Sequence, residues 1–505
     1  MSSNEQQLSG PDFARGVPAS DIVDGKMLLG HFDGEAVLLA KTGAEIFAVG
    51  ATCTHYNGPL AEGLLVGDTV RCPWHHACFS LRTGEALRAP ALNPVSCFRI
   101  EESGETVFVR EKIEKSPKPQ VKPDSHVRSV VIVGGGAAGN AAAEMLRRQE
   151  FKGTVTILSA DDALPYDRPN LSKDYLAGNA SEDCIPLRTP DFYNEQKIDV
   201  RLKTRVVAID TVEREVTLAD GSHVAFDALL LATGAAPVRL DIPGAGLPHV
   251  HYLRTLDDSR ALIAKTKDAK RAVVIGASFI GLETAASLRA RDIEVHVVGP
   301  QSRPLERVLG AELGDMIRAI HEERGVVFHF GTTAVAIDED MVTLKSGDRI
   351  PADLVVAGIG VQPDTALAKA AGLTIDNGVV VDQYLQTSVP GIYAAGDIAR
   401  WPDPHSGAPI RVEHWVVAER QGQTAAINML GGRQPFDAAP FFWSQHFDVT
   451  VSYVGHAEKW DKIEIDGDPS SRDCKVTYLK SGRKLAVATV SRDLESLRAE
   501  VELES

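Results

Sequence analysis

The first hundred or so residues alternate short β-prone runs with glycine turns and show little helical periodicity. Such runs lie at Ala36–Ala40, Ile46–Val49, Thr69–Cys72 and Thr106–Arg110. Short strands separated by turns are typical of a small all-β domain. The pattern therefore predicts an all-β domain over residues 8–114.

A proline- and lysine-rich segment follows this domain. Lys115–Pro123 reads KSPKPQVKP, a composition that favours extended polyproline II geometry over packing. The sequence therefore predicts a linker over residues 115–127. The segment of about 14 residues from Glu114 to Val127 would reach roughly 20 Å as a flexible chain, or about 43 Å as a polyproline II helix.

Two later segments each combine a buried strand, a glycine turn and a helix. Ser129–Val133 is followed by glycines and the helix-forming run Asn140–Arg148, and Ala272–Ile275 is followed by a glycine and Leu282–Ala290. A strand, a glycine turn and a helix in this order begin a βαβ nucleotide-binding unit. The chain therefore contains two predicted Rossmann-like units.

The last segment, from about residue 435, returns to alternating strands. Val449–Val454 and Leu485–Val490 have the strand pattern, and Leu494–Glu504 has the pattern of a charged helix. This combination predicts an α+β lobe over residues 435–505.

Composition narrows the class of protein. The chain has 505 residues, 44% hydrophobic and 24% charged, which is typical of a globular protein with several domains. Its net charge of -16 would repel a phosphate backbone, so we expect no nucleic-acid partner. No window approaches the ~18 apolar residues of a membrane-spanning helix. The first ten residues lack a secretory pattern, and we expect a cytoplasmic location.

Two cysteine–histidine motifs lie in the all-β domain. Cys53 and His55 form C-x-H, and Cys72 and His75 form C-x-x-H. Two thiolates on one iron and two imidazoles on the other are the ligands of a Rieske [2Fe-2S] cluster. A Cys2His2 zinc site uses the same donors and is the alternative that these residues leave open.

The two motifs resemble those of the Rieske ferredoxin family. High-potential Rieske domains have two loop cysteines and a serine where this chain has Gly58, Trp74 and Ala77. Hydrogen bonds to the cluster sulfurs stabilise the reduced state, so the missing serine predicts a potential near the low end of the Rieske range, roughly -150 mV. Such a cluster suits an acceptor of electrons from a flavin.

The first glycine turn has the form of a dinucleotide fingerprint, in which backbone N–H groups and a helix N-terminus approach a pyrophosphate. The motifs Leu231–Gly234 and Gly391–Asp397 resemble the accessory motifs of two-dinucleotide flavoprotein reductases. This resemblance implies that Asp397 bonds the ribityl chain of FAD. It also implies FAD contacts from Gly134, Gly136, Ala138, Gly139, Ala232, Thr233, Gly234, Gly396 and Asp397.

The segment Leu164–Lys173 narrows the resemblance to ferredoxin reductases of oxygenase systems and to apoptosis-inducing factor. With the Rieske motifs in front, nearly the whole chain resembles the Rieske-containing flavoproteins of the apoptosis-inducing-factor type. That family implies FAD contacts from Arg168 and Lys173, and a Lys173–Glu283 pair near flavin N5. A cation there stabilises the negative charge that arrives with hydride, so Lys173 and Glu283 are the predicted catalytic residues.

The same resemblance places the segment Glu413–His414–Trp415 against the flavin. Its aromatic groups could cover the isoalloxazine ring or relay electrons, and core packing is the alternative for Trp415. No C-x4-C pair follows the first βαβ unit, so the sequence does not support disulfide reductase chemistry.

The second fingerprint is incomplete. Its predicted nicotinamide nucleotide contacts are Gly276, Ser278, Ile280 and Gly281, with Ser278 in the place of the middle glycine. The acid expected after the next strand is replaced by Gly299. Arg303 lies nearby and could accept a 2'-phosphate, so neither NADH nor NADPH is excluded.

These resemblances imply a multidomain chain with an N-terminal all-β Rieske domain followed by two Rossmann-like α/β domains. The FAD domain is expected over 128–245 and 370–434, the NAD(P) domain over 246–369, and the C-terminal α+β reductase lobe over 435–505. The expected activity is NAD(P)H oxidation through FAD, with one-electron output to the chain's own [2Fe-2S] cluster and on to an acceptor. The reach of the linker predicts that flavin and cluster exchange electrons within one chain.

Two alternatives remain at this stage. One is the reductase component of an oxygenase system, and the other is a redox-responsive binding protein of the apoptosis-inducing-factor type. The sequence also leaves open the electron acceptor, which can be a protein, and the choice between monomer and homodimer.

Overall fold

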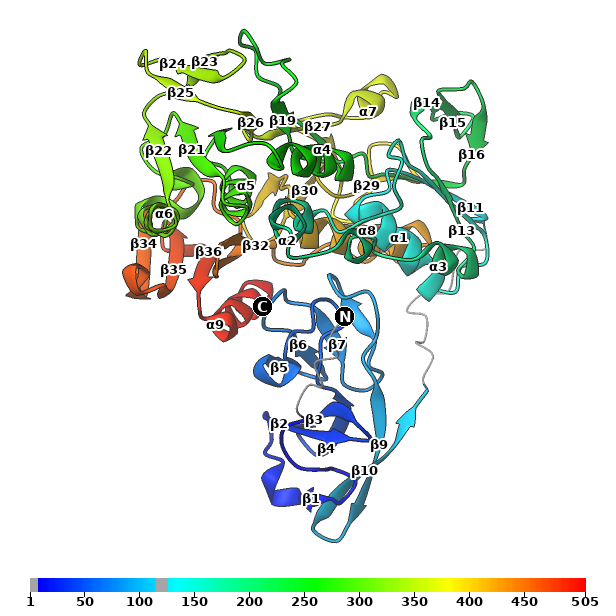
Figure 1. The fold of residues 1–505 in the computed structure, drawn as a ribbon. Helices are drawn as coiled ribbons and strands as arrows, with labels where there is room; N and C mark the ends of the chain where they lie inside the picture. Colours follow the sequence, from blue (N-terminus) through cyan, green and yellow to red (C-terminus); the bar gives the residue numbers. More distant parts are fainter. Residues whose placement is uncertain (1–7, 115–125) are drawn as a thin grey trace. The chain divides into compact units, whose positions relative to one another are not determined.

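The computed structural model describes residues 8–114 and 126–505 (Figure 1). Two compact units make up the chain. The first comprises Met1–Gln120 and Asp493–Ser505, and the second comprises Val121–Arg492. Of the expected linker over 115–127, residues 115–125 lie outside the described residues.

The first unit contains two antiparallel sheets. Six strands form the larger sheet in the order β1 (Val17–Pro18), β10 (Thr106–Ile113), β9 (Cys97–Ser103), β4 (Glu45–Gly50), β3 (Glu35–Thr42) and β2 (Met27–Phe32). Four short strands form the smaller sheet, namely β5 (Leu64–Val66), β6 (Thr69–Arg71), β7 (Cys78–Ser80) and β8 (Ala86–Arg88). The expected all-β N-terminal domain is confirmed.

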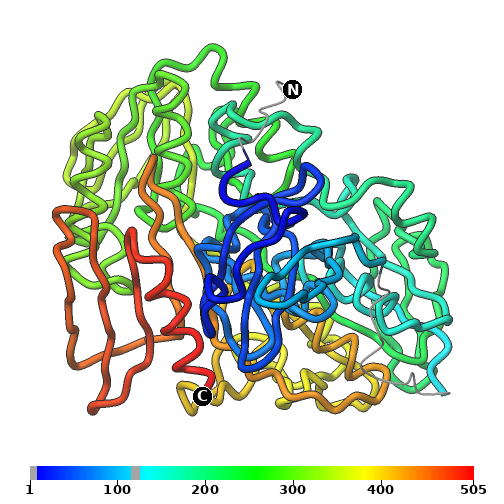
Figure 2. The backbone as a smooth tube through the Cα atoms, turned by 90° about the horizontal axis from the view of Figure 1, so that it is seen from below, coloured from blue at the N-terminus to red at the C-terminus, as the bar shows by residue number. Residues whose placement is uncertain are grey.

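One helix belongs to this unit although it is the last element of the chain. Helix α9 (Asp493–Glu504) lies beside β5 (Figure 1), and Figure 2 shows the red C-terminal helix next to the blue N-terminal backbone. Its buried side chains recur with helical spacing at Ser496, Leu497, Ala499 and Glu500. The sequence pattern predicted this helix within a lobe over 435–505, and one amphipathic face does not specify what covers it.

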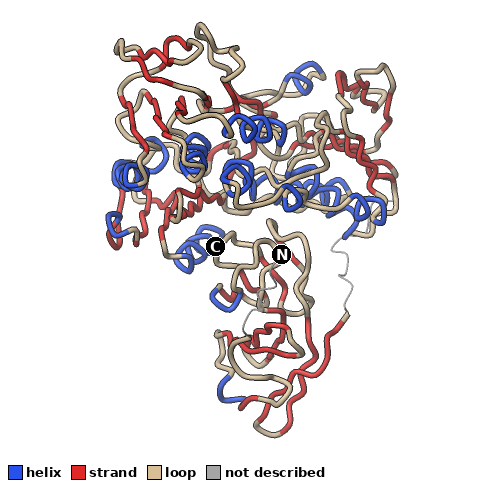
Figure 3. The backbone as a smooth tube through the Cα atoms, in the orientation of Figure 1, coloured by secondary structure: helices blue, strands red, loops and turns tan. Residues whose placement is uncertain are grey.

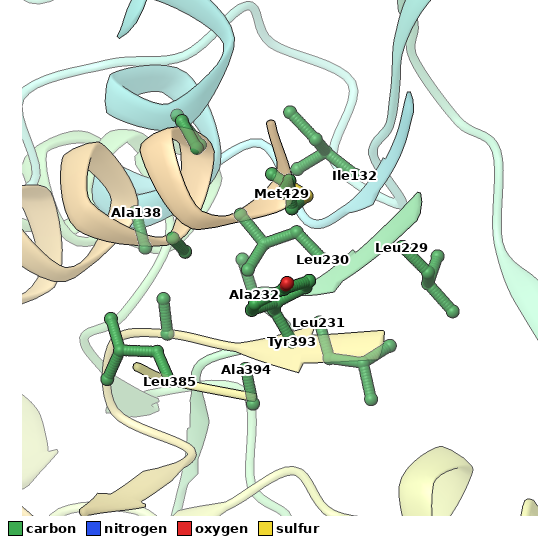
Figure 4. Close-up of a cluster of buried hydrophobic side chains, with 14 of the residues drawn as sticks. Ile132, Ala138, Leu229, Leu230, Leu231, Ala232, Leu385, Tyr393, Ala394 and Met429 are labelled. Carbon is green, nitrogen blue, oxygen red and sulfur yellow. The ribbon is translucent and has the colours of Figure 1, made fainter. Parts of the chain in front are cut away.

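The second unit begins with a parallel five-stranded sheet. Its strands follow the order β13 (Ile198–Arg201), β12 (Thr154–Leu158), β11 (Ser129–Val133), β17 (Ala228–Leu231) and β29 (Ile392–Ala394). Side chains of β17 and β29 pack with Ile132 and Met429 in a continuous apolar core (Figure 4). Strands β17 and β29 are buried on both faces of the sheet. Their sequences are therefore apolar throughout and do not alternate between apolar and polar residues.

A second parallel sheet repeats this topology. Its order is β19 (Val250–Tyr252), β26 (Leu354–Ala357), β20 (Arg271–Ile275), β21 (Glu294–Gly299) and β22 (Val326–Phe330). In each sheet the first strand of the βαβ unit is central and its helix follows directly, α1 (Ala137–Arg148) after β11 and α5 (Phe279–Arg289) after β20. The predicted pair of Rossmann-like α/β units is confirmed.

The rest of the second unit consists of smaller pieces around these sheets, which Figure 3 shows as a mixture of helix and strand. Helices α2 (Asp174–Ala177), α3 (Pro190–Glu195), α4 (Leu256–Thr266), α6 (Glu306–Glu323), α7 (Ala366–Ala370) and α8 (Trp415–Met429) lie between or beside the strands. Short antiparallel pieces are β14 (Val206–Asp210), β15 (Glu215–Leu218) and β16 (His223–Ala225); β23 (Ala334–Ile337), β24 (Met341–Leu344) and β25 (Arg349–Pro351); and β18 (Ala235–Pro237) with β27 (Val361–Pro363). A mixed piece contains β28 (Val379–Val380), β30 (Ala399–Asp403) and β31 (Ala408–Ile410).

The C-terminal lobe of this unit is one antiparallel sheet. Its order is β32 (Phe441–His446), β33 (Val449–Gly455), β36 (Arg483–Val490), β35 (Asp473–Lys480) and β34 (Lys462–Asp468). The predicted strands at Val449–Val454 and Leu485–Val490 are therefore present. Strand β32 contacts α5 and α8, and this brings the lobe to the nucleotide-binding helices.

Helices α1 and α8 pack closely at a glycine. A Cβ atom on Gly422 of α8 would lie 2.2 Å from the carbonyl oxygen of Ala138 in α1. We predict that Gly422→Ala lowers the free energy of unfolding. Overpacking costs about 1–3 kcal/mol, which exceeds the ~1 kcal/mol that alanine gains over glycine inside a helix. Denaturant unfolding measures the change.

Gly246→Ala is the matched control, because a Cβ atom there meets no atom within 4 Å and the backbone is not left-handed. Its expected effect is neutral or a gain of up to about 1 kcal/mol. Equal stability of the two variants would contradict the tight crossing of α1 and α8.

Candidate functional site

A cavity of about 610 Å³ lies in the second unit where both βαβ helices and the C-terminal lobe meet. The N-terminal ends of α1 and α5 open onto it, and so does β32. The predicted residues that line it are Gly136, Ala138, Arg168, Lys173, Ala232, Gly234, Ser278, Ile280, Glu283, Gly396, Asp397, Glu413, His414 and Trp415. These predicted residues line one cavity although they come from parts of the chain up to nearly 300 residues apart.

The first glycine turn holds its strand and helix in close contact. Gly134 has φ of +116°, and a Cβ atom there would lie 2.1 Å from the carbonyl oxygen of Ala232. A Cβ atom on Gly139 would lie 2.0 Å from the carbonyl oxygen of Gly134. Neither glycine lines the cavity, so each acts by letting the backbone turn sharply, while Gly136 and the start of α1 face the cavity.

Arg168, Arg254 and Arg411 line the cavity and bring positive charge to it. Arg168 lies near Gly136, and Arg254 Nη2 donates to Asp397 Oδ2 over 2.6 Å. Burial and the charge of Arg168 lower the pKa of Arg254, and the Asp397 carboxylate partly offsets both effects. Arg411 Nη1 donates to the Asp397 backbone oxygen at 2.9 Å. The carboxylate of Asp397 is thus paired with the guanidinium of Arg254.

Several buried polar atoms at the cavity have no hydrogen-bond partner among the residues that the structure describes. They include Arg168 Nε, Arg411 Nε and His414 Nδ1. Burying such atoms without a partner is costly. Their positions fit a bound group that carries phosphates and polar ring atoms, and the glycine turn leaves room for its pyrophosphate. These residues fit FAD.

The predicted pair Lys173–Glu283 is in contact at one side of the cavity. Lys173 Nζ lies 2.8 Å from Glu283 Oε2, and Ser172 Oγ donates to the same oxygen over 2.7 Å. Ser444 Oγ donates to the other carboxylate oxygen, Oε1, over 2.7 Å. The Glu283 side chain is 3% exposed. Three donors thus hold a buried carboxylate, which in turn fixes the direction of the Lys173 ammonium.

Strand β32 supplies part of this network. Ser444 and His446 lie two residues apart on the strand and so point to the same side. Burial and the charge of Lys173 lower the pKa of His446 to about 3, so it is neutral near pH 7. Its Nδ1 lies 3.2 Å from Nε2 of His321. Sequence reasoning missed both β32 residues, because a serine and a histidine in a strand form no motif.

Ser278, which stands in place of a fingerprint glycine, has a structural role in the second turn. It is the N-cap of α5, where its Oγ accepts from Gly281 N at 3.2 Å and donates to Gly358 O at 2.7 Å. Gly276 allows the close approach of this turn, since a Cβ atom there would lie 2.3 Å from the Gly358 oxygen. Ser278 and Ile280 line the cavity, and Gly276 and Gly281 lie behind it.

Arg303 is engaged by two carboxylates. Its Nε lies 2.6 Å from Asp315 Oδ1 and its Nη1 lies 3.3 Å from Glu306 Oε1. Hydrogen bonding to Asp315 and the two negative charges raise the pKa of Arg303. The side chain does not line the cavity. Thr233 is turned away too, since its Oγ1 donates to Asp364 O over 2.7 Å.

The four predicted cysteine and histidine ligands lie close together in the first unit. Cys53 and His55 lie between β4 and β5, and Cys72 and His75 lie in the turn between β6 and β7. The Nδ1 atoms of His55 and His75 are 3.2 Å apart. A Cβ atom on Gly58 would lie only 2.7 Å from Cys72 Sγ, so the glycine leaves space next to this sulfur.

The protonation tendencies in this pocket suit metal ligands. Burial lowers the pKa of His55 to about 3, which keeps its imidazole neutral. Contact with Cys72 lowers the pKa of Cys53, opposed by burial, and the backbone N–H groups of His55 and Tyr56 add to the lowering. The same sulfur contact and burial raise the pKa of Cys72. A neutral imidazole at His55 and a stabilised thiolate at Cys53 are the states in which these groups bind iron. With the close approach of His55 and His75, the four residues fit a [2Fe-2S] cluster.

Comparison with known proteins settles the family. The family model for pyridine nucleotide-disulphide oxidoreductases matches residues 128–422. The chain belongs to this family. The Rieske [2Fe-2S] domain model matches residues 15–99 and decides between the cluster and the zinc alternative, and the model for the reductase C-terminal domain matches residues 441–501.

Relatives match over most of the chain. Apoptosis-inducing factor 3 of Homo sapiens is 32% identical over 94% of this chain and 81% of its own length. Putidaredoxin reductase CamA of Pseudomonas putida is 37% identical over 73% of this chain and 89% of its own. The crystal structure of the covalent putidaredoxin reductase–putidaredoxin complex gives a TM-score of 0.72 at 37% identity, covering 74% of this chain and 92% of that one.

The family membership confirms the predicted enzyme class and cofactors. The chain is a ferredoxin reductase-like NAD(P)H flavoprotein with a Rieske domain, and its cofactors are FAD, a nicotinamide nucleotide and a [2Fe-2S] cluster. None of the described helices is both long and apolar enough to cross a membrane.

Some site residues were not predicted. They come from segments without a glycine fingerprint and include the cavity-lining side chains of Arg254, Arg411, Phe442, Trp443 and Tyr453. Only Arg254 has a sequence signal nearby, because it directly precedes the capping box of α4 formed by Thr255 and Asp258. Phe442 and Trp443 are consecutive residues of β32 and Tyr453 lies in the apolar strand β33, so their pattern does not distinguish a cavity wall from a core.

The absence of an acid at the end of β21 makes nucleotide choice testable. We predict that Gly299→Glu lowers kcat/KM for NADPH about tenfold or more, a change of ~1.4 kcal/mol, while NADH oxidation persists. The new carboxylate would bond a ribose 2'-hydroxyl and repel a 2'-phosphate. A Cβ atom at Gly299 would lie 3.1 Å from the flexible end of Gln301, which can move aside. Steady-state kinetics with both nucleotides measure the ratio.

Gly299→Gln is the matched control, because it has the same length without the charge. An equal loss of NADPH activity in both variants would show that bulk rather than charge matters at this position, and the position would then not control nucleotide choice.

Proposed function

We propose that this chain oxidises NADH or NADPH at the cavity of the second unit and delivers single electrons to its own Rieske cluster and then to an external acceptor. The observation that carries this proposal is the Lys173–Glu283–Ser444 network at the wall of one cavity, onto which both nucleotide-binding helices open. FAD, when bound, supplies the conversion of a two-electron hydride donor into one-electron output.

The chain's own residues supply positive charge to the cavity and hold it in a fixed direction. Arg168, Arg254 and the N-terminus of α1 provide positive potential where a pyrophosphate fits. Lys173 holds its proton on Nζ next to the buried carboxylate of Glu283, which prevents the ammonium from turning away. Because the cavity wall is largely apolar and aromatic around them, these charges act in a medium that screens them weakly.

We predict that Lys173→Ala retains FAD but slows flavin reduction by nicotinamide nucleotide about 10²-fold, the cost typical of losing one charge-stabilising group. The lost cation acts on charge that develops during hydride transfer rather than on ground-state binding alone. Stopped-flow absorbance of the flavin under anaerobic conditions measures the rate.

Lys203→Ala is the control, since this lysine lies in the same unit with a side chain 75% exposed. Its rate should equal that of the wild type. If Lys173→Ala reduces its flavin as fast as the control does, Lys173 has no part in hydride transfer.

If electrons pass from the flavin to the cluster of the same chain, reduction of the cluster should be a first-order step. After rapid anaerobic mixing with nicotinamide nucleotide, cluster reduction should follow flavin reduction with a rate constant that does not change over a wide dilution series. A covalently attached partner has an effective concentration typically in the millimolar range. Freeze-quench EPR of the reduced cluster measures the rate.

Cys72→Ser should abolish the cluster and leave flavin reduction intact. A rate of cluster reduction that rises in proportion to protein concentration would mean that electrons travel between chains, and the single-chain route would be wrong.

The external acceptor is proposed to be a small redox protein. Relatives carry the names of ferredoxin and rubredoxin reductases, and a similar solved structure is titled as a complex of a reductase with putidaredoxin. This favours, as a second candidate, a role as the reductase component of an oxygenase system. We further propose a cytoplasmic monomer or homodimer, since a reduced nicotinamide pool is its donor. Steady-state turnover with added ferredoxins, with cytochrome c for comparison, separates an enzyme from a binding protein that turns over negligibly.

A further inference from the structure

Helix α9 makes a buried charge network with the strands that carry the second cluster motif. Arg71, the last residue of β6 and the neighbour of Cys72, places Nη1 2.7 Å from Glu500 Oε2 and Nη2 2.9 Å from Glu504 Oε2. Arg88 of β8 places Nη1 2.6 Å from Glu504 Oε1. The side chain of Glu500 is 0% exposed. The two glutamates are one helical turn apart and therefore face the same side.

A second contact reaches the cluster loop itself. His76 directly follows the ligand His75 and is fully buried. Its ring spans one turn of α9, with Nε2 3.1 Å from Ser496 Oγ and Nδ1 3.3 Å from Glu500 Oε2. Both ring nitrogens of His76 thus face polar atoms of the helix.

The backbone of His76 closes the turn that presents the ligands. Its φ is +59°, in the left-handed region that is uncommon for residues other than glycine. Its N–H donates to Cys72 O over 3.2 Å, and Cys72 N–H donates to Ala77 O over 2.8 Å. An unusual backbone conformation persists where the surroundings hold it, and here the surroundings of the side chain include α9.

We propose that α9 is an integral part of the cluster-binding domain, in which Glu500 and Ser496 are positioning residues. They hold His76 and Arg71, and through these residues they hold the turn that presents Cys72 and His75 to the cluster. Glu500 and Glu504 lie more than 400 residues after Arg71 in the chain. Their spacing is explained because it puts both carboxylates on the one face of α9 that is buried against Arg71. The inference rests on the presence of the Rieske cluster and is independent of the proposed electron route.

The cluster should report the loss of either contact. In the full-length protein reduced by dithionite without nucleotide, Glu500→Gln should shift the midpoint potential to a more positive value, because a negative charge near the cluster is removed while Arg71 remains. It should also speed the release of iron to a chelator by about tenfold or more, because one partner of a buried ion pair is missing. Ser496→Ala should speed iron release without the positive shift in potential.

Glu502→Gln is the control, because Glu502 is an exposed glutamate two residues along the same helix and therefore faces away from Glu500. Potential, EPR g-values and iron release should match the wild type. FAD content is measured in every sample. Loss of the cluster with FAD retained in Glu500→Gln supports the proposal even if no potential can be recorded.

Two results would overturn the proposal. One is a Glu500→Gln protein whose potential, EPR g-values and iron release equal those of Glu502→Gln. The other is the loss of FAD and cluster together, which would show that α9 serves the folding of the whole chain. Neither result depends on nucleotide, so failure here and failure of the single-chain electron route are distinguishable.

Discussion

The buried carboxylate of Glu283 is the interaction on which the catalytic unit depends. It lies on α5, the helix of the second βαβ unit, and it accepts from Ser172 and Lys173 of the FAD part and from Ser444 of the C-terminal lobe. A buried charge is tolerated only when its partners are present. Three parts of the chain must therefore meet at one point, and the cavity lies at that meeting point.

The same physical device occurs in the cluster domain. Glu500 is fully buried, and its partners are an arginine and a histidine that flank the second ligand motif. In both cases a carboxylate from one helix orients cationic or polar groups that belong to another segment. Removing one partner leaves the buried carboxylate desolvated and unpaired, which is costly. Each contact therefore acts more by specifying which segments associate than by adding net stability.

Much of this arrangement could be predicted from sequence. The glycine turns of the two βαβ units and the cysteine–histidine motifs are local signals, because backbone geometry and ligand spacing constrain residues close in the chain. The Lys173–Glu283 contact came from resemblance to a family. Contacts of β32 and α9 could not be predicted, since Ser444 and Glu500 are ordinary residues whose roles arise only from long-range packing.

Arg303 shows a different limit of sequence reasoning. A cation near the end of β21 suggested a phosphate ligand, but the carboxylates of Asp315 and Glu306 already bind it. Charge identity can be read from a sequence, whereas charge pairing depends on which side chains the fold brings within about 4 Å. For the same reason, the sequence does not predict that Arg254 lies on the Asp397 carboxylate.

The assignment of α9 changes what covalent attachment means for electron transfer. The sequence indicated one connection between the cluster domain and the reductase, a linker with a reach of tens of ångströms. The structure adds a second one, because β36 ends at Val490 and α9 begins at Asp493. Three residue steps span at most about 11 Å. Helix α9, which contacts Arg71 and His76, is therefore joined to the end of β36 by a short stretch of chain. The helix that we propose to position the cluster ligands is thus also a second covalent connection between the cluster domain and the reductase unit.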